Sequence, residues 1–256
     1  MKLPWRSRRE EADSPGEEAG HTEPVGVRIE PARRKRWSVR RVATTALILF
    51  AGYYLFCLVL LLAYRFVDPP TTGVQIQRRA EALVSGREYS KRRDIVAFEA
   101  LPSHVPRAVV AAEDGRFWDH FGFDWQEMLI ASRDATGGVR IRGASTITQQ
   151  LMKNLFGTTH ANPIRKVYDI TLTPAAEVIL GKQRILELYL NQVEWGPGIY
   201  GIDQGARRHY GTGATGLSRT QSAGLAALLP GPLRRTPDNT GQYRQEILRR
   251  MSQRGW

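Results

Sequence analysis

The sequence predicts a mainly α-helical protein with one membrane-spanning helix near its N-terminus. The first observation behind this fold class is the run 42–64, in which 23 consecutive residues carry no charge. A helix rises about 1.5 Å per residue, so this run can cross a hydrocarbon core of roughly 30 Å. The second observation is the spacing of apolar residues further on, which recur every three or four positions between capping residues. We therefore expect one outer domain of roughly five to eight helices with short loops.

The composition limits both the partners and the stabilising interactions. The chain has 256 residues and a formal net charge of +12. Such an excess of positive charge indicates an anionic partner, which is a nucleic acid, an anionic membrane surface or a phosphorylated substrate. Cys57 is the single cysteine, so an intrachain disulfide is excluded and the fold depends on packing.

The charges around the apolar run predict its orientation. Eleven Lys or Arg residues precede it, whereas Arg65 alone follows before Asp68. The positive-inside bias places the N-terminus in the cytoplasm and residues 65–256 on the outer face. Residues 1–41 are rich in Glu, Arg, Pro and Gly, which predicts disorder. We interpret the charge of this tail as a topology signal, and we expect no nucleic-acid partner.

These signals divide the chain into four segments. They are a disordered cytoplasmic tail over 1–41, a transmembrane anchor over 42–64, a linker and membrane-proximal segment over 65–101, and a helical domain over 102–256. Val74 to Val84, within the linker, is expected to form an amphipathic helix. A basic domain held beside a membrane favours anionic lipid head groups.

Capping signals place the helices of the outer domain in order. The expected caps are Asp124 before 125–135, Ser145 before 146–155, Asn162 before a helix that opens at Pro163, and Ser218 with Gln221 before a helix that ends at Pro230. Val105, Val109 and Ala112 share one face of an earlier helix.

The later helices carry three further expectations. Pro174 lies inside the helix from Pro163 to Val178 and should kink or break it. Apolar spacing predicts a helix over 182–192 with its inward side chains at Ile185, Leu186, Tyr189 and Leu190. A last helix, over 243–252, is basic and is expected to be peripheral.

The first candidate site is the pair Glu113 and Asp114, which ends an apolar helix beside three aromatic residues. Burial raises a carboxyl pKa and nearby cations lower it, and a carboxylate that stays ionised can act as a general base. The alternative is that one of the two caps a neighbouring turn or pairs with Arg116.

Two further stretches carry polar side chains at helical spacing. Ser145, Gln149 and Lys153 step by four and line one face, which suits a sugar-phosphate substrate; the alternative is a solvated face. Arg165 and Lys166 lie near a helix N-terminus, where the dipole already favours anions. Asp169 follows Lys166 by three, so the two share a face.

These stretches belong to an ordered set of five motifs. The motifs are Glu113-Asp114-x-x-Phe117-x-x-His120-x-Gly122-x-Asp124, Gly143-Ala144-Ser145-Thr146-Ile147-Thr148-Gln149-Gln150-x-x-Lys153-Asn154, Arg165-Lys166, Arg184-Ile185-Leu186-x-x-Tyr189-Leu190-Asn191, and Gly198-x-x-Gly201. In this order and spacing they resemble the peptidoglycan glycosyltransferases, or transglycosylases, of glycosyltransferase family 51. The resemblance extends from about Pro69 to Pro237, and with one anchor the chain is most similar to the monofunctional biosynthetic type.

The resemblance implies a lysozyme-like helical fold that polymerises lipid II into glycan strands, with inversion and release of polyprenyl diphosphate. It makes Glu113 the catalytic base and Asp169 the second acid. It places Lys153, Arg165 and Lys166 where basic residues meet the pyrophosphate. The remaining substrate-binding positions that it implies are Asp114, Phe117, Ser145, Thr146, Gln149, Gln150 and Asn154.

The resemblance also implies a location and partners. The protein is expected in the bacterial inner membrane, with a cytoplasmic N-terminus and a periplasmic catalytic domain. The expected partners are lipid II, the lipid-linked glycan strand, the membrane, and other cell-wall synthesis or division proteins. A divalent cation, magnesium or manganese, is the one cofactor considered.

Two departures from the family pattern leave alternatives open. Asp169 stands where the family usually has Glu, and Asp is shorter by one methylene. Ala161 stands where many members carry an arginine, for which the neighbouring His160 is a candidate substitute. The first alternative is therefore a weakened or inactive homologue that serves as a lipid II-binding scaffold. The second is a lysozyme-like enzyme that cuts glycan.

Overall fold

The computed structural model describes residues 38–136, 145–160 and 163–256. The described residues from Thr44 to Trp256 belong to one compact unit. The predicted disorder of the tail concerns residues that lie almost wholly outside the described part of the chain.

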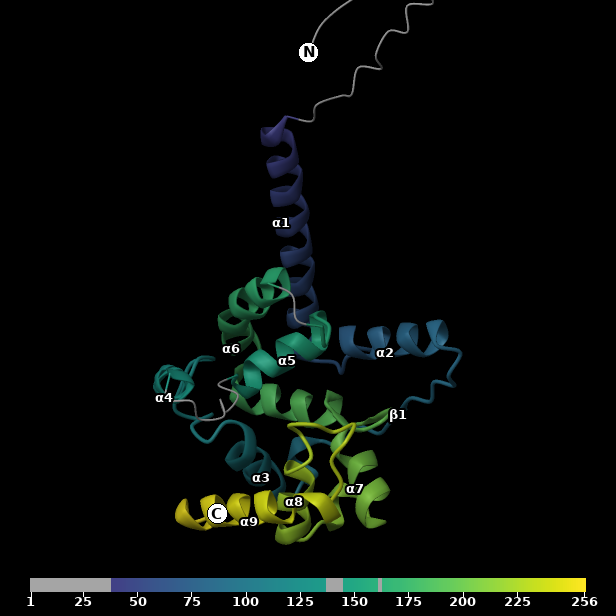
Figure 1. The fold of residues 1–256 in the computed structure, drawn as a ribbon, viewed down its shortest axis with the longest axis vertical. Coiled ribbons are helices and arrows are strands. Elements are labelled where there is room, and N and C mark those ends of the chain that lie inside the picture. Colours follow the sequence, from purple (N-terminus) through teal and green to yellow (C-terminus); the bar gives the residue numbers. More distant parts are fainter. Residues whose placement is uncertain (1–37, 137–144, 161–162) are drawn as a thin grey trace, which may run out of the picture. The chain divides into compact units, whose positions relative to one another are not determined.

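The prediction of a mainly α-helical protein is confirmed, since the described residues form nine α-helices and one small sheet (Figure 1). The helices are α1 (Val39–Tyr64), α2 (Gly73–Val84), α3 (His104–Glu113), α4 (Trp125–Thr136), α5 (Ile147–Phe156), α6 (Pro163–Gln192), α7 (Ile202–Tyr210), α8 (Arg219–Ala226) and α9 (Gly241–Gln253). The strands β1 (Arg92–Arg93), β2 (Glu194–Gly196) and β3 (Ile199–Tyr200) follow the order β1-β3-β2, in which β1 is parallel and β2 antiparallel to β3.

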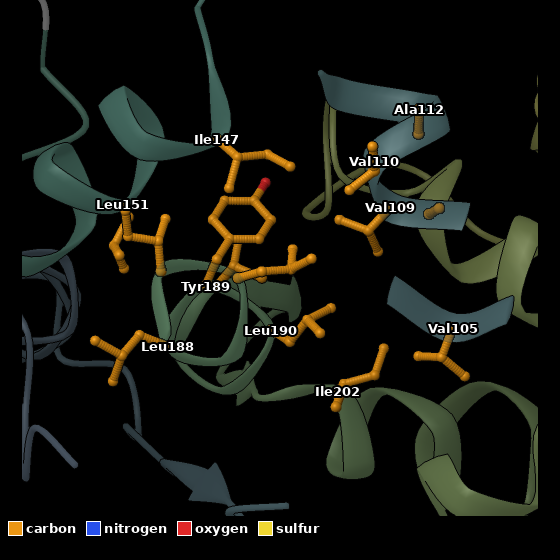
Figure 2. Close-up of a cluster of buried hydrophobic side chains, with 14 of the residues drawn as sticks. Val105, Val109, Val110, Ala112, Ile147, Leu151, Leu188, Tyr189, Leu190 and Ile202 are labelled. Atoms are coloured by element: carbon orange, nitrogen blue, oxygen red, sulfur yellow. The ribbon is translucent and has the colours of Figure 1, made fainter. Parts of the chain in front are cut away.

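The second half of α6 lies at the centre of the hydrophobic core. Its four predicted inward residues are each at most 1% exposed: Ile185, Leu186, Tyr189 and Leu190. Figure 2 shows the ring of Tyr189 among side chains of α3 and α5, with Ile147 close to its hydroxyl end. Helix α3 also packs against α8 and α9, so its apolar residues are buried on several faces and not only on the predicted one.

The break in α6 is at Gly181 and not at Pro174, which corrects the sequence-based expectation. Backbone angles stay helical through Pro174, whereas Gly181 has φ 74° and ψ 163°. A residue with a Cβ rarely adopts this conformation, so glycine fixes the place where the helix changes direction. The predicted cap at Asn162 lies outside the described residues.

Helix α9 is part of the core, and the expectation that it is peripheral was wrong. Ile247 and Met251 are fully buried, and α9 packs against α3 and α8. Its many basic residues concealed this role, because only two of its apolar side chains are fully enclosed. Helix α8 ends at Ala226, four residues before Pro230.

Helix α1 is, within the described part of the chain, the one helix that is long and apolar enough to cross a membrane. Its middle is attached to α6. The rings of Phe50 and Tyr168 stack with centroids 4.5 Å apart. Beyond the end of α1, Arg184 donates from Nε to the carbonyl of Tyr64 and from Nη2 to that of Val67, each at 2.9 Å. The end of α1 is therefore bonded directly to the helix at the centre of the core.

Candidate active site

Glu113 is the last residue of α3, and helix α9 holds that end in place. Tyr243 donates its hydroxyl to the carbonyl of Ala112 at 2.8 Å, and Arg250 donates to the carbonyl of Ala111 at 3.2 Å. The last carbonyls of a helix lack partners inside the helix, so these bonds satisfy them from outside. None of the sequence motifs contains Tyr243 or Arg250, and sequence reasoning missed both.

The Glu113 carboxylate is half-buried and accepts a hydrogen bond from the side-chain amide of Gln150, 2.8 Å from Nε2 to Oε2. Burial raises the pKa of Glu113, and Asp114 adds to this rise. The bond from Gln150 and the positive charges of Lys153 and Arg235 act in the opposite direction. A desolvated carboxylate whose ionised form has a donor and cations beside it suits proton abstraction.

Asp114 serves a different purpose from its neighbour. Its Oδ1 lies 2.8 Å from Nε2 of His120, and its Oδ2 accepts the backbone N–H of Ile147 at 3.0 Å. Asp114 therefore caps the start of α5, whereas Arg116 pairs with Asp124. The capping alternative holds for Asp114 and not for Glu113, and neither carboxylate pairs with Arg116.

The side chain of Phe117 anchors the loop between Asp114 and Asp124 in the core. This ring is fully buried, and Nζ of Lys182 lies 4.4 Å from its centroid. Asp124 accepts the backbone N–H of Glu127 at 2.8 Å, which confirms it as the cap of α4. The loop is thus fixed at both of its ends and in its middle.

The start of α5 differs from the expectation by one residue. Thr146, not Ser145, is the N-cap, and it forms a reciprocal capping box with Gln149. The Thr146 hydroxyl also donates to the carbonyl of Gly122 at 2.7 Å. Gln149 therefore faces the cap, so the predicted polar row of Ser145, Gln149 and Lys153 does not act as one face.

The neighbouring glutamine, Gln150, is the one that reaches Glu113. Its Oε1 accepts the hydroxyl of Tyr189 at 2.9 Å, and its backbone carbonyl accepts Nδ2 of Asn154 at 2.9 Å. The charge of Lys153 also acts on Glu113. Gln150 and Lys153 thus lie near the carboxylate, whereas Asn154 is bonded to the backbone of Gln150. Ser145 lies half-buried just before the cap.

The predicted site residues on α6 differ in their exposure. Asp169 is only 5% exposed, whereas Lys166 lies on the surface. The side chain of Arg165, like residue Ala161, lies outside the described residues. His160 has its Nε2 3.3 Å from Oε1 of Glu81, so it is directed toward α2.

A cluster of Asp114, His120 and Asp124 has the donor set of a metal site, because its ligand atoms lie within 4.8 Å of one another. The existing contacts do not suit an ion. Both oxygens of Asp114 are used by His120 and Ile147, and both oxygens of Asp124 are used by Arg116. An ion would have to displace these partners, so the cluster is a hydrogen-bond network that supports the loop.

The arrangement combines one desolvated carboxylate with nearby positive charges, in a chain whose described part has one helix that is long and apolar enough to cross a membrane. The chain belongs to the transglycosylase family, whose model matches residues 80–252. It is 38% identical to the biosynthetic peptidoglycan transglycosylase of Pseudomonas putida strain F1 over 221 residues, which cover 85% of this chain and 92% of that protein. The protein of the same name from Pseudomonas aeruginosa PAO1 is 40% identical over 198 residues, which cover 77% of this chain and 85% of that protein.

Proposed function

We propose that this protein polymerises lipid II into the glycan strands of peptidoglycan, with inversion at the anomeric carbon and release of polyprenyl diphosphate. The observation that carries the proposal is the Glu113 carboxylate, which is half-buried at the end of α3, bonded to Gln150 and influenced by Lys153 and Arg235. Relatives that share most of the chain are named as biosynthetic transglycosylases, which supports synthesis over cleavage.

In the proposed reaction Glu113 removes the proton from the 4-hydroxyl of the acceptor sugar. The hydroxyl oxygen then forms a bond to the donor's anomeric carbon, from the face opposite the diphosphate. The bond between that carbon and the diphosphate oxygen breaks, and the electron pair leaves with the diphosphate. A sugar hydroxyl is a weak nucleophile, so a positioned base contributes about 10²- to 10⁴-fold.

The leaving diphosphate requires its growing negative charge to be offset. We assign this role to Lys153 together with Arg165 and Lys166, and a magnesium or manganese ion bound to the diphosphate would supply further positive charge. Ser145 and Asn154 are assigned to the substrate. Asp169 is assigned the part of the second acid.

The remaining assignments concern the shape of the site. Thr146 and Gln149 hold the start of α5 through their capping box, and Gln150 holds the base. Asp114 and Phe117 fix the loop that follows the end of α3. These residues contribute to substrate binding by placing Ser145, Lys153 and Asn154 around the base.

We place the catalytic domain in the periplasm, with α1 across the inner membrane and the N-terminus in the cytoplasm. The length and apolar character of α1 support this topology, as do the eleven basic residues that precede residue 42. The segment of residues 65–101 would then lie at the bilayer surface, where the lipid tail enters. Other proteins of cell-wall synthesis or division are the partners that this location favours.

The deciding experiment is polymerisation of lipid II by the full-length protein in detergent. We expect long glycan chains from the wild type and from Asp119→Asn, which changes an exposed carboxylate in the same loop. Glu113→Gln should yield none, and a chelator should slow the wild type. Equal activity of Glu113→Gln would refute the assignment of the base.

Two other outcomes correspond to the alternatives. Soluble fragments released from purified cell wall, without any lipid-linked substrate, would indicate a glycan-cutting enzyme. Binding of lipid II without polymer formation would indicate a scaffold. In that case the double variant Asp169→Glu with Ala161→Arg should also remain inactive.

A further inference from the structure

A chain of two hydrogen bonds leads from the core to the base. The hydroxyl of Tyr189 donates to Oε1 of Gln150 at 2.9 Å, and Nε2 of Gln150 donates to Oε2 of Glu113 at 2.8 Å. The second hydrogen of the same amide points to the carbonyl of Ser145 at 3.4 Å. Both polar atoms of the Gln150 side chain are therefore engaged, and the amide has one favourable orientation.

The opposite orientation of this amide would be unfavourable. A carboxylate and a carbonyl can only accept hydrogen bonds, so an amide turned over would set its oxygen against Glu113 and Ser145. The hydroxyl of Tyr189 helps to exclude that state because it supplies the donor that Oε1 requires. A buried acceptor left without a donor is destabilising.

Tyr189 is suited to remain a donor under all working conditions. Its side chain is 1% exposed, and Figure 2 shows its ring enclosed by the apolar cluster. Burial, with the negative charges of Glu113 and Asp114 and the nearby Tyr243, raises its pKa well above the usual value. Its hydroxyl therefore keeps its proton, and the packed ring fixes the direction in which the hydroxyl points.

We propose that Tyr189 is a positioning residue for the transfer reaction: by donating to Gln150 it holds the amide N–H on Glu113, and so keeps this carboxylate ionised and ready to accept a proton. This role rests on the proposed function, but the hydrogen-bond chain itself can be tested without substrate. The charged groups that face Glu113 are Lys153 on α5, Arg235 after α8 and Asp114 at the end of α3.

The first test is a carbon-13 NMR titration of the Glu113 carboxyl in the full-length protein, assigned by its loss in Glu113→Gln. Tyr189→Phe keeps the ring and removes only the hydroxyl. We expect its midpoint to move to higher pH, because the ionised carboxylate loses a firmly held donor. Tyr89→Phe is the matched control, since this hydroxyl donates to the backbone carbonyl of Gln75 and not to Gln150. An unchanged midpoint in Tyr189→Phe would overturn the proposal.

The second test is the pH–rate profile of lipid II polymerisation. The acidic limb of Tyr189→Phe should move to higher pH, with about a tenfold loss of rate at the acidic end that is partly recovered in alkali. A uniform loss at every pH would indicate a structural role and refute the proposal. A moved NMR midpoint in a protein that makes no polymer would support the positioning chain and reject the proposed function instead.

A double-mutant comparison tests whether Tyr189 acts on Glu113 through Gln150. Gln150→Leu removes the middle of the chain, so adding Tyr189→Phe to it should move the midpoint no further. Additive shifts would mean that Tyr189 acts on Glu113 by another path, and would contradict the proposal. Thermal unfolding of each variant provides the check that it is folded.

Discussion

Asp114 accepts the backbone N–H of Ile147 at 3.0 Å and so joins the end of α3 to the start of α5. The residue before it, Glu113, directs its carboxylate to Gln150 on the same helix α5. The two adjacent acids thus have different roles: Asp114 links α3 to α5, and Glu113 faces the candidate site. This division explains why a Glu-Asp pair is placed at a helix end.

Asp114→Asn should destabilise the protein by about 1–3 kcal/mol. The asparagine side chain has a single oxygen, so it can accept a hydrogen bond from Ile147 or from His120 but not from both. Its NH₂ group then faces the partner that is left. If His120 accepts instead, its proton moves to Nδ1, which is buried and has no hydrogen-bond partner among the described residues. Denaturant unfolding measures the loss. Asp119→Asn, in the exposed part of the loop, should change stability little, and equal losses in both would contradict the role of Asp114.

Glu113→Gln should make the protein more stable near neutral pH while it abolishes the proposed activity. Burial raises the pKa of Glu113 in the folded state above its ordinary value of 4.5. Between these two values the folded state binds more protons than the unfolded chain, so stability falls as pH rises through that window. The gain from the substitution should therefore be present at neutral pH and disappear in acid.

Thermal unfolding at both pH values measures this gain. Glu88→Gln, which neutralises an exposed glutamate, is the control and should show no such dependence. A Glu113→Gln protein that is less stable than the wild type at neutral pH would contradict the direction of the shift.

Thr146→Ala should lower both stability and the rate of polymerisation. The substitution removes the cap of α5 and the bond to Gly122, at a cost of about 1–2 kcal/mol. Ser218→Ala removes the equivalent capping box of α8, so it should lower stability to a similar degree and leave the turnover rate unchanged. Turnover rates of the two variants, compared at equal loss of stability, separate the effect on the site from the effect on the fold.

Asp169→Ala should have the next largest effect on turnover after Glu113→Gln, a loss of about a hundredfold. The expectation follows from the assignment of Asp169 as the second acid and from its burial on α6, where it is 5% exposed. Asp119→Ala is the exposed control. Steady-state assays with lipid II measure the change, and a neutral result would mean that the second acid has no counterpart here.

Local signals in the sequence were sufficient for much of the fold. The inward face of residues 182–192 and the capping box of Ser218 depend on residues a few positions apart, and both predictions are confirmed. Ser145 and Thr146 are both favourable caps in isolation, with serine slightly preferred. The choice between them depends on Gly122, which is distant in sequence and accepts the hydroxyl of Thr146.

The neighbours of Glu113 could be predicted only in part. A helical period places Gln149 and Gln150 only 100° apart around the axis, so spacing alone cannot decide which one meets Glu113. The capping box occupies Gln149 and leaves Gln150 for the site. Arg235 and Tyr243 belong to no motif, because their roles arise from the packing of α8 and α9 against α3.

Arg184 bonds to the carbonyls of Tyr64 and Val67 and lies five residues before Tyr189 on the same helix. These two bonds couple the orientation of α1 to that of α6. With α1 across a bilayer as proposed, the enzyme would drift through the lipid as an oriented body with its catalytic face at a set height. A freely swivelling tether would need to find that alignment again for every sugar added.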